Sequence, residues 1–146
     1  MTDDAIQILL VEDDPQDVEL TLRALHNENL GNRIEIARDG EEALDFLFCR
    51  GAHSNRSHAL QLKLVLLDLK LPKVDGLQVL REIKASPECR AIPVVVLTSS
   101  GEQRDIVESY QLGVNSYIQK PVDIAQFRQT IKSLGLYWLV VNRPPA

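Results

Sequence analysis

Acidic side chains follow directly after two apolar stretches of this chain. Glu12-Asp13-Asp14 comes after a run of aliphatic residues, and Asp68 comes after Lys63–Leu67. Clustered carboxylates repel one another, so each raises the pKa of its neighbours unless a cation lies between them. Carboxylate oxygens together with water are the ligands that Mg²⁺ prefers. These residues therefore predict a magnesium site, if the fold brings the two acidic groups together.

A hydroxyl and an amine follow two further apolar stretches. Thr98 comes after Pro93–Leu97, and Lys120 comes after Ser116–Gln119. A carboxylate beside a bound metal ion can attack a phosphorus centre and form an aspartyl phosphate. The Thr98 hydroxyl and the Lys120 ammonium would then neutralise the phosphoryl oxygens. The pattern predicts phosphoryl transfer to one of the carboxylates.

Each of these residues also has an ordinary structural explanation when taken alone. Asp14 precedes Pro15 and suits a helix cap better than a metal ligand. Glu12 and Asp13 suit solvated loop charges equally well, and Thr98 suits a helix cap. A lysine before a proline is usually a surface residue. The functional interpretation depends on the combination, because chance seldom places all of these groups after four separate strands.

Apolar runs alternate with helical repeats along the chain. Short runs rich in Val, Ile and Leu predict buried strands, and apolar residues repeated every three or four positions predict helices between them. This alternation favours an α/β fold with a parallel sheet covered on both faces, whose ligands bind beyond the carboxyl ends of the strands. The predicted strands are Ile6–Val11, Arg33–Ala37, Lys63–Leu67, Pro93–Leu97 and Ser116–Gln119. The predicted helices run from Pro15 to before Gly31 and over Gly76–Ser86, Glu102–Leu112 and Ile124–Leu134, and a further helix that carries Ala43, Leu44, Leu47 and Phe48 follows a turn at Asp39-Gly40.

Length and composition limit the class of protein. The chain has 146 residues, of which 45% are hydrophobic and 25% charged, so we expect one domain with its own core. Its net charge of −5 argues against a nucleic-acid or anionic-membrane surface, because both need a basic face. The acidic N-terminus and the shortness of every apolar run predict a cytoplasmic protein without a membrane span.

The chain resembles the receiver domain of bacterial two-component response regulators. The similarity covers nearly the whole chain and is carried by Ile8–Pro15, Val65–Pro72, Asp75-Gly76, Pro93–Ser99 and Lys120-Pro121. It implies a flavodoxin-like, doubly wound sheet of five parallel strands in the order 2-1-3-4-5. It also implies a single receiver domain over residues 1–146, without an output domain.

The resemblance implies a role for each acidic residue of the site. Asp68 would accept a phosphoryl group from a sensor histidine kinase, with Mg²⁺ as the cofactor. Asp68 and Asp13 would bind the metal directly, Glu12 would bind it through water, and the main-chain carbonyl of Lys70 would complete the protein ligands. Such a protein catalyses only its own phosphorylation and dephosphorylation, so we do not expect an enzyme in the ordinary sense.

The resemblance also implies a switch. Lys120, joined to Pro121 by a cis bond, would pair with the phosphoryl group. Thr98 and Tyr117 match the switch pair of the family, in which the hydroxyl moves toward the new charge and the ring turns inward. A half-exposed aromatic residue on a strand is an equally good explanation of Tyr117.

Two features depart from the common receiver pattern. Gly51–Leu62 is longer than usual, and residues 136–146 form an apolar extension with the only tryptophan. Both features resemble the small response regulators that pair with cyanobacterial phytochrome histidine kinases, where an aromatic extension helps to form a homodimer. We therefore expect a homodimer through residues 136–146. The alternative is a tail folded back on its own domain.

Other functions on the same kind of sheet are less consistent with the sequence. A pseudo-receiver, which acts as a constitutive interaction module, would be favoured if Asp68, Asp13 or Lys120 were missing, and all three are present. A haloacid-dehalogenase-like phosphatase would need a second acid where Lys70 stands. A flavodoxin would need a phosphate loop after the first strand, where this chain has acids that repel a phosphate.

Overall fold

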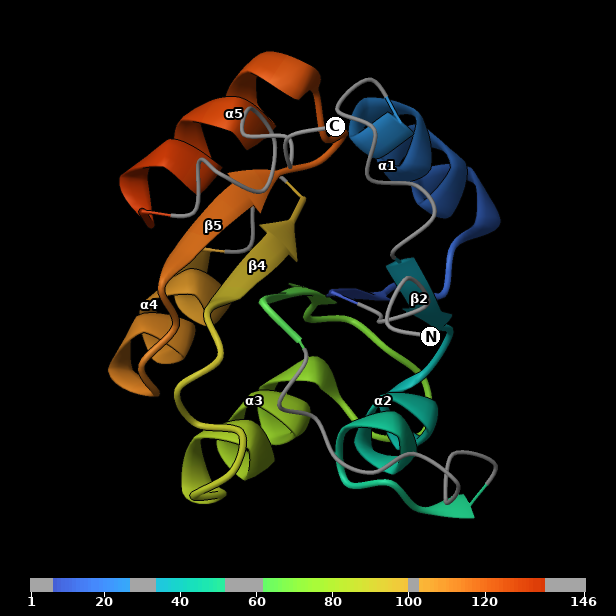
Figure 1. Cartoon of the computed structure of the whole chain (residues 1–146), viewed down its shortest axis with the longest axis vertical. Helices are drawn as coiled ribbons and strands as arrows, with labels where there is room; N and C mark the ends of the chain where they lie inside the picture. The colour runs from blue at the N-terminus through green and yellow to red at the C-terminus, as the bar shows by residue number, and fades with distance from the viewer. Residues whose placement is uncertain (1–6, 27–33, 52–61, 100–102, 136–146) are drawn as a thin grey trace, which may run out of the picture.

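A computed structural model describes residues 7–26, 34–51, 62–99 and 103–135 of the chain (Figure 1). Within these ranges, strands and helices alternate as the apolar pattern predicts. The strands are β1 (Ile8–Val11), β2 (Ile34–Ala37), β3 (Leu64–Asp68), β4 (Val94–Thr98) and β5 (Ser116–Gln119). The helices are α1 (Pro15–His26), α2 (Gly40–Leu47), α3 (Gly76–Ala85), α4 (Gln103–Gln111) and α5 (Ile124–Ser133).

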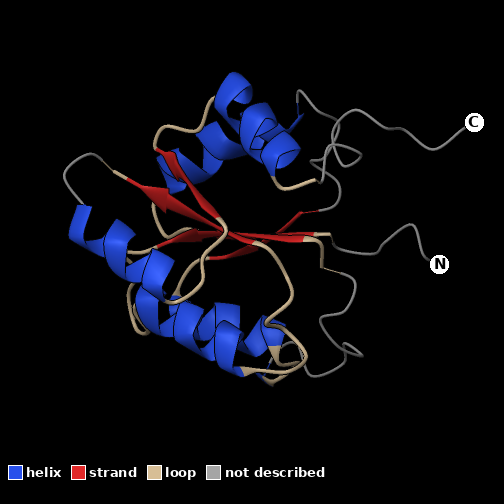
Figure 2. Cartoon of the chain, turned by 90° about the vertical axis from the view of Figure 1, so that its left-hand side faces the viewer, coloured by secondary structure: helices blue, strands red, loops and turns tan. Residues whose placement is uncertain are grey.

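The described strands form one parallel sheet in the order β2-β1-β3-β4-β5, so the predicted doubly wound topology is confirmed. Helices lie on both sides of the sheet (Figure 2). Successive side chains of a strand point to opposite faces. Leu9 of β1 accordingly belongs to the apolar cluster with α2 and α3, whereas Leu10 belongs to the cluster with α1 and α5.

The strands β3 and β4 each continue one residue beyond their predicted ends. Asp68 is the last residue of β3 and Thr98 is the last residue of β4, where they take up register positions opposite Leu97 and Gln119. The sheet therefore holds both backbones in place. The helices α3 and α5 end one residue before their predicted ends, because Ser86 and Leu134 are their C-cap residues.

The turn after β3 fixes the backbone around Asp68. The Gly76 N–H donates to the Leu69 carbonyl at 3.0 Å, and Asp75 caps α3 by accepting from the Leu77 N–H at 3.3 Å. A Cβ atom at Gly76 would overlap the Asp68 carbonyl oxygen and the Leu69 backbone. Only glycine allows the start of α3 to come this close to the end of β3.

Several predicted segments lie wholly or largely outside the described residues. These are the first residue of the predicted strand at Ile6, the long segment at Gly51–Leu62 except for its ends, and the extension over residues 136–146. Within the residues that the structure describes, no helix is long and apolar enough to cross a bilayer.

Candidate functional site

Three carboxylates gather at the carboxyl ends of β1 and β3. Ligand oxygens of Glu12, Asp13 and Asp68 all lie within 4.8 Å of one another. The neighbouring parallel strands place Val11 opposite Leu67, so the residues that follow them meet at one edge of the sheet. Glu12 and Asp68 are buried, and Asp13 is exposed. The predicted gathering of acids is confirmed, and an all-oxygen set open on one side fits a hard divalent cation.

Asp14 is not part of this cluster. Its carboxylate accepts a hydrogen bond from the Gln16 N–H at 2.9 Å, which satisfies one of the free donors at the start of α1. Its own N–H donates to Glu12 Oε2 at 3.2 Å and so orients that side chain. The helix-cap interpretation of Asp14 is therefore confirmed.

Lys120 provides the positive charge of the site. Its Nζ lies 3.1 Å from Asp68 Oδ2, 3.3 Å from Glu12 Oε1 and 3.1 Å from Asp17 Oδ2. The Lys120 side chain is only 12% exposed, so these ion pairs are far better shielded from water than surface pairs. The Lys120 N–H also donates to the Thr98 carbonyl at 2.7 Å, which fixes the backbone from which the side chain extends.

Asp17 is the functional residue that sequence reasoning missed. It lies in the first turn of α1, where the helix dipole stabilises a negative charge. This local effect already accounted for an acidic residue at position 17. Its ion pair with Lys120 joins residues that are 103 positions apart. No local pattern in the sequence pointed to this contact, because its two partners lie far apart along the chain.

The charges of the site perturb one another. Burial, followed by the neighbouring Asp68 carboxyl, raises the pKa of Glu12 to about 8, and the Lys120 charge offsets only part of this effect. Burial lowers the pKa of Lys120, but the carboxylates of Asp68, Asp17 and Glu12 more than compensate and raise it above its ordinary value. Lys120 therefore stays an ammonium, and the Glu12 carboxyl keeps its proton more readily than an ordinary glutamic acid.

Both oxygens of the Asp68 carboxylate accept hydrogen bonds. The Lys70 N–H donates to Asp68 Oδ1 at 3.1 Å, and Lys120 binds Oδ2. The Lys70 carbonyl as a metal ligand stays a prediction. The peptide bond between Lys120 and Pro121 is cis, as the resemblance implied.

The residues of the predicted switch differ in exposure. Thr98 is buried at the end of β4, and its hydroxyl donates to the Ser99 carbonyl at 3.1 Å. Tyr117 on β5 is 43% exposed. Its ring makes a T-shaped contact with Tyr110 of α4, with centroids 6.2 Å apart and planes at 88°. Tyr117 thus points outward here, and its role in a switch stays a prediction.

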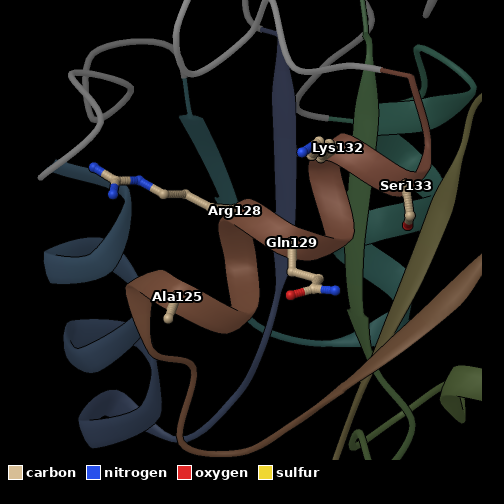
Figure 3. Close-up of a pocket in the computed structure, with 5 residues that line it drawn as sticks. All are labelled: Ala125, Arg128, Gln129, Lys132 and Ser133. Atoms are coloured by element: carbon tan, nitrogen blue, oxygen red, sulfur yellow. The ribbon is translucent and has the colours of Figure 1, made fainter.

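A hollow of about 690 Å³ lies along α5 (Figure 3). None of the described residues that line it belongs to the acidic cluster, so the hollow is separate from the candidate site. They are Ala125, Arg128, Gln129, Lys132 and Ser133.

Comparison with known proteins gives one consistent match. The family model "Response regulator receiver domain" matches residues 8–132. The probable methanogenesis regulatory protein FilR2 of Methanothrix harundinacea is 44% identical over 98% of this chain and 90% of its own length. Response regulator Rcp1 of Synechocystis is 39% identical over 95% of this chain and 92% of its own length.

Solved structures agree with the sequence matches. The bacteriophytochrome response regulator RtBRR superposes with a TM-score of 0.84 at 50% identity, over 97% of this chain and 84% of that one. The Mn²⁺-bound form of Rcp1 superposes with a TM-score of 0.75 at 38% identity, over 97% of this chain and 99% of that one.

Proposed function

This chain belongs to the family of response regulator receiver domains, and on that premise we propose that Asp68 accepts a phosphoryl group from a sensor histidine kinase. The observation that carries the assignment is the Lys120 ammonium, 3.1 Å from Asp68 Oδ2 within a cluster of three carboxylates. A receiver needs this combination, because the acceptor must be a carboxylate and the incoming phosphoryl oxygens need fixed positive charge.

The cofactor is Mg²⁺ in this proposal. Glu12, Asp13, Asp68 and the Lys70 carbonyl would hold the ion, which supplies positive charge that offsets the carboxylates and the phosphoryl oxygens. The Mn²⁺-bound form of Rcp1 supports a divalent cation in a related receiver.

The chain's own residues position the reacting groups. The Lys70 N–H and Lys120 hold the Asp68 carboxylate from two sides, so the rigid end of β3 presents it in one orientation. An Asp68 oxygen attacks the phosphorus atom, and the bond from phosphorus to the donor breaks. Lys120 then offsets the charge of the phosphoryl oxygens, and the Thr98 hydroxyl donates a hydrogen bond to one of them. The protein thereby catalyses its own phosphorylation and dephosphorylation and no other reaction.

The signal leaves through the surface of α4 and β5. Thr98 moves toward the phosphoryl group, and the Tyr117 ring leaves its outward position beside Tyr110. The contact surface presented by these two elements changes as a result. No base-reading surface is involved, because the chain is acidic overall.

The partner is a histidine kinase of the phytochrome type, as the names of RtBRR and of other similar structures suggest. The protein acts in the cytoplasm as a homodimer whose contact includes the apolar extension at residues 136–146.

The test is the intact mass of the protein after incubation with acetyl phosphate and Mg²⁺. Wild type should gain one phosphoryl group, and neither Asp68→Asn nor wild type without Mg²⁺ should gain any. The alternative is a pseudo-receiver, which would remain folded, take no phosphoryl group and also fail to bind beryllium fluoride with Mg²⁺. Beryllium fluoride binding without phosphorylation would instead indicate a strict requirement for the kinase as donor.

A further inference from the structure

Among the described residues, Asp17 is the one carboxylate that binds Lys120 without belonging to the acidic cluster. The ammonium has three N–H donors, and Glu12, Asp17 and Asp68 each place one oxygen within 3.3 Å of it. Glu12 and Asp68 are also members of the group that fits a cation, whereas Asp17 is not.

We propose that Asp17 is a positioning residue that keeps the Lys120 ammonium beside Asp68 when a divalent cation engages Glu12 and Asp68. This inference rests on the function proposed above for the same site. A bound cation competes with Lys120 for the oxygens of Glu12 and Asp68, and two positive charges then lie close together and repel. Asp17 is the partner that remains.

Lys120 needs such a partner because its side chain is a flexible four-carbon chain with a strongly hydrated head. Without an anchor, repulsion from the cation would drive the ammonium toward solvent and away from the position of the phosphoryl oxygens. The Asp17 side chain is 25% exposed and that of Lys120 12%, so the pair is shielded enough to hold the ammonium firmly.

The backbone of Asp17 is itself rigid. Asp17 is the third residue of α1, and the next residue, Val18, is buried in the core cluster that α1 shares with β1 and α5. A carboxylate on a packed helix holds its partner more accurately than one on a loop. Lys120 is thus fixed from α1 as well as from β3.

The experiment compares wild type with Asp17→Asn, with the conservative variant Asp17→Glu and with Glu19→Gln. Glu19 lies two residues farther along α1, is exposed and pairs only with Arg23 among the described ion pairs, so Glu19→Gln removes the same charge away from the site. The first readout is the rate at which an acetylating N-hydroxysuccinimide ester labels the Lys120 amine, with and without Mg²⁺. The second is the rate of phosphorylation by acetyl phosphate.

Mg²⁺ should leave the labelling of Lys120 nearly unchanged in wild type and in Glu19→Gln. In Asp17→Asn it should speed labelling about tenfold, the change that corresponds to losing one hydrogen bond between charged groups. The same variant should accept the phosphoryl group roughly threefold to tenfold more slowly, since one fixed donor is displaced. Asp17→Glu, which keeps the carboxylate, should restore both rates at least in part.

Two results would overturn the role of Asp17. One is Asp17→Asn labelled at the wild-type rate in Mg²⁺, and the other is phosphorylation of that variant at or above the wild-type rate, which would make Asp17 a competitor of the phosphoryl group. If wild type neither takes a phosphoryl group nor binds beryllium fluoride with Mg²⁺, the proposed function fails, whereas the labelling rates still decide whether Asp17 holds Lys120. Circular dichroism of each variant establishes that it is folded.

Discussion

The ammonium of Lys120, just after β5, lies 3.1 Å from the carboxylate of Asp68 at the end of β3, with β4 between the two strands (Figure 1). The two residues are 52 positions apart in the chain, so only the folded sheet brings them together. The pair supplies the acceptor and its neutralising charge in a single contact. The same Lys120 ammonium also pairs with Glu12, so it offsets the negative charge of both carboxyl groups.

Replacement of Lys120 by Met should therefore destabilise the metal-free protein. Removing one partner of a buried ion pair leaves an uncompensated charge, which costs about 3 kcal/mol of unfolding free energy. The loss should shrink on addition of Mg²⁺, which restores positive charge beside the carboxylates. Chemical denaturation with and without Mg²⁺ measures it, with Lys132→Met on the exposed side of α5 as the control. Equal destabilisation in the two variants would contradict the assigned role of Lys120.

The pKa of Glu12 makes the stability of the metal-free protein depend on pH. This pKa is about 8 in the folded chain against an ordinary 4.5, so the folded state binds more protons than the unfolded state between these values. Stability should accordingly fall as pH rises from about 4.5 to about 8 and then level off. Glu12→Gln should remove most of this slope, and Glu19→Gln should keep it. Denaturation curves in EDTA across the range decide the point, and a wild-type slope that survives in Glu12→Gln would exclude Glu12 as its source.

Phosphorylation should move the ring of Tyr117. The chain has three tyrosines, so incorporated fluorotyrosine should give three ¹⁹F signals, and Tyr117→Phe identifies the relevant one. We expect the Tyr117 signal to shift on phosphorylation as the ring leaves its contact with Tyr110. In Thr98→Val, which lacks the hydroxyl, Asp68 should still accept the phosphoryl group but the shift should be lost. An unchanged Tyr117 signal in fully phosphorylated wild type would rule out this residue as a switch.

Deletion of residues 136–146 should weaken the homodimer. The apolar run Leu136–Val141 is the part that is expected to contribute, because burial of aromatic and aliphatic side chains drives association. Sedimentation equilibrium should show a higher dissociation constant for this deletion, whereas removal of Asn142–Ala146 alone should change little. If the long deletion has the same dissociation constant as wild type, the extension does not contribute to the dimer, and the alternative of a tail folded back on its own domain would be favoured.

Much of the architecture could be predicted because its signals are local. Runs such as Val94–Thr98 consist almost wholly of β-branched and aliphatic residues, and buried parallel strands require this composition. The strand order and the individual roles at the site came from the family resemblance instead. Even so, the strand ends were placed one residue early at Asp68 and Thr98, since a polar side chain at the last ladder position resembles the first residue of a loop.

The remaining features depend on contacts between distant side chains. The ion pair of Asp17 with Lys120 and the ring contact of Tyr110 with Tyr117 join different elements, and neither leaves a periodic pattern in the sequence. Asp17 also had a sufficient local explanation in the dipole of α1. A residue with a sufficient local role, such as Asp17, can therefore also make a long-range contact that the sequence does not reveal.

The most direct test of the central claim is to locate the phosphoryl group on the chain. Wild type is phosphorylated with acetyl phosphate and Mg²⁺, the acyl phosphate is reduced with borohydride to homoserine, and the altered residue is identified by peptide mass spectrometry. We predict homoserine at position 68 and no modification at Glu12 or Asp13. Homoserine at Asp13, or stoichiometric phosphorylation that persists in Asp68→Asn, would contradict Asp68 as the acceptor and with it the proposed function of Lys120.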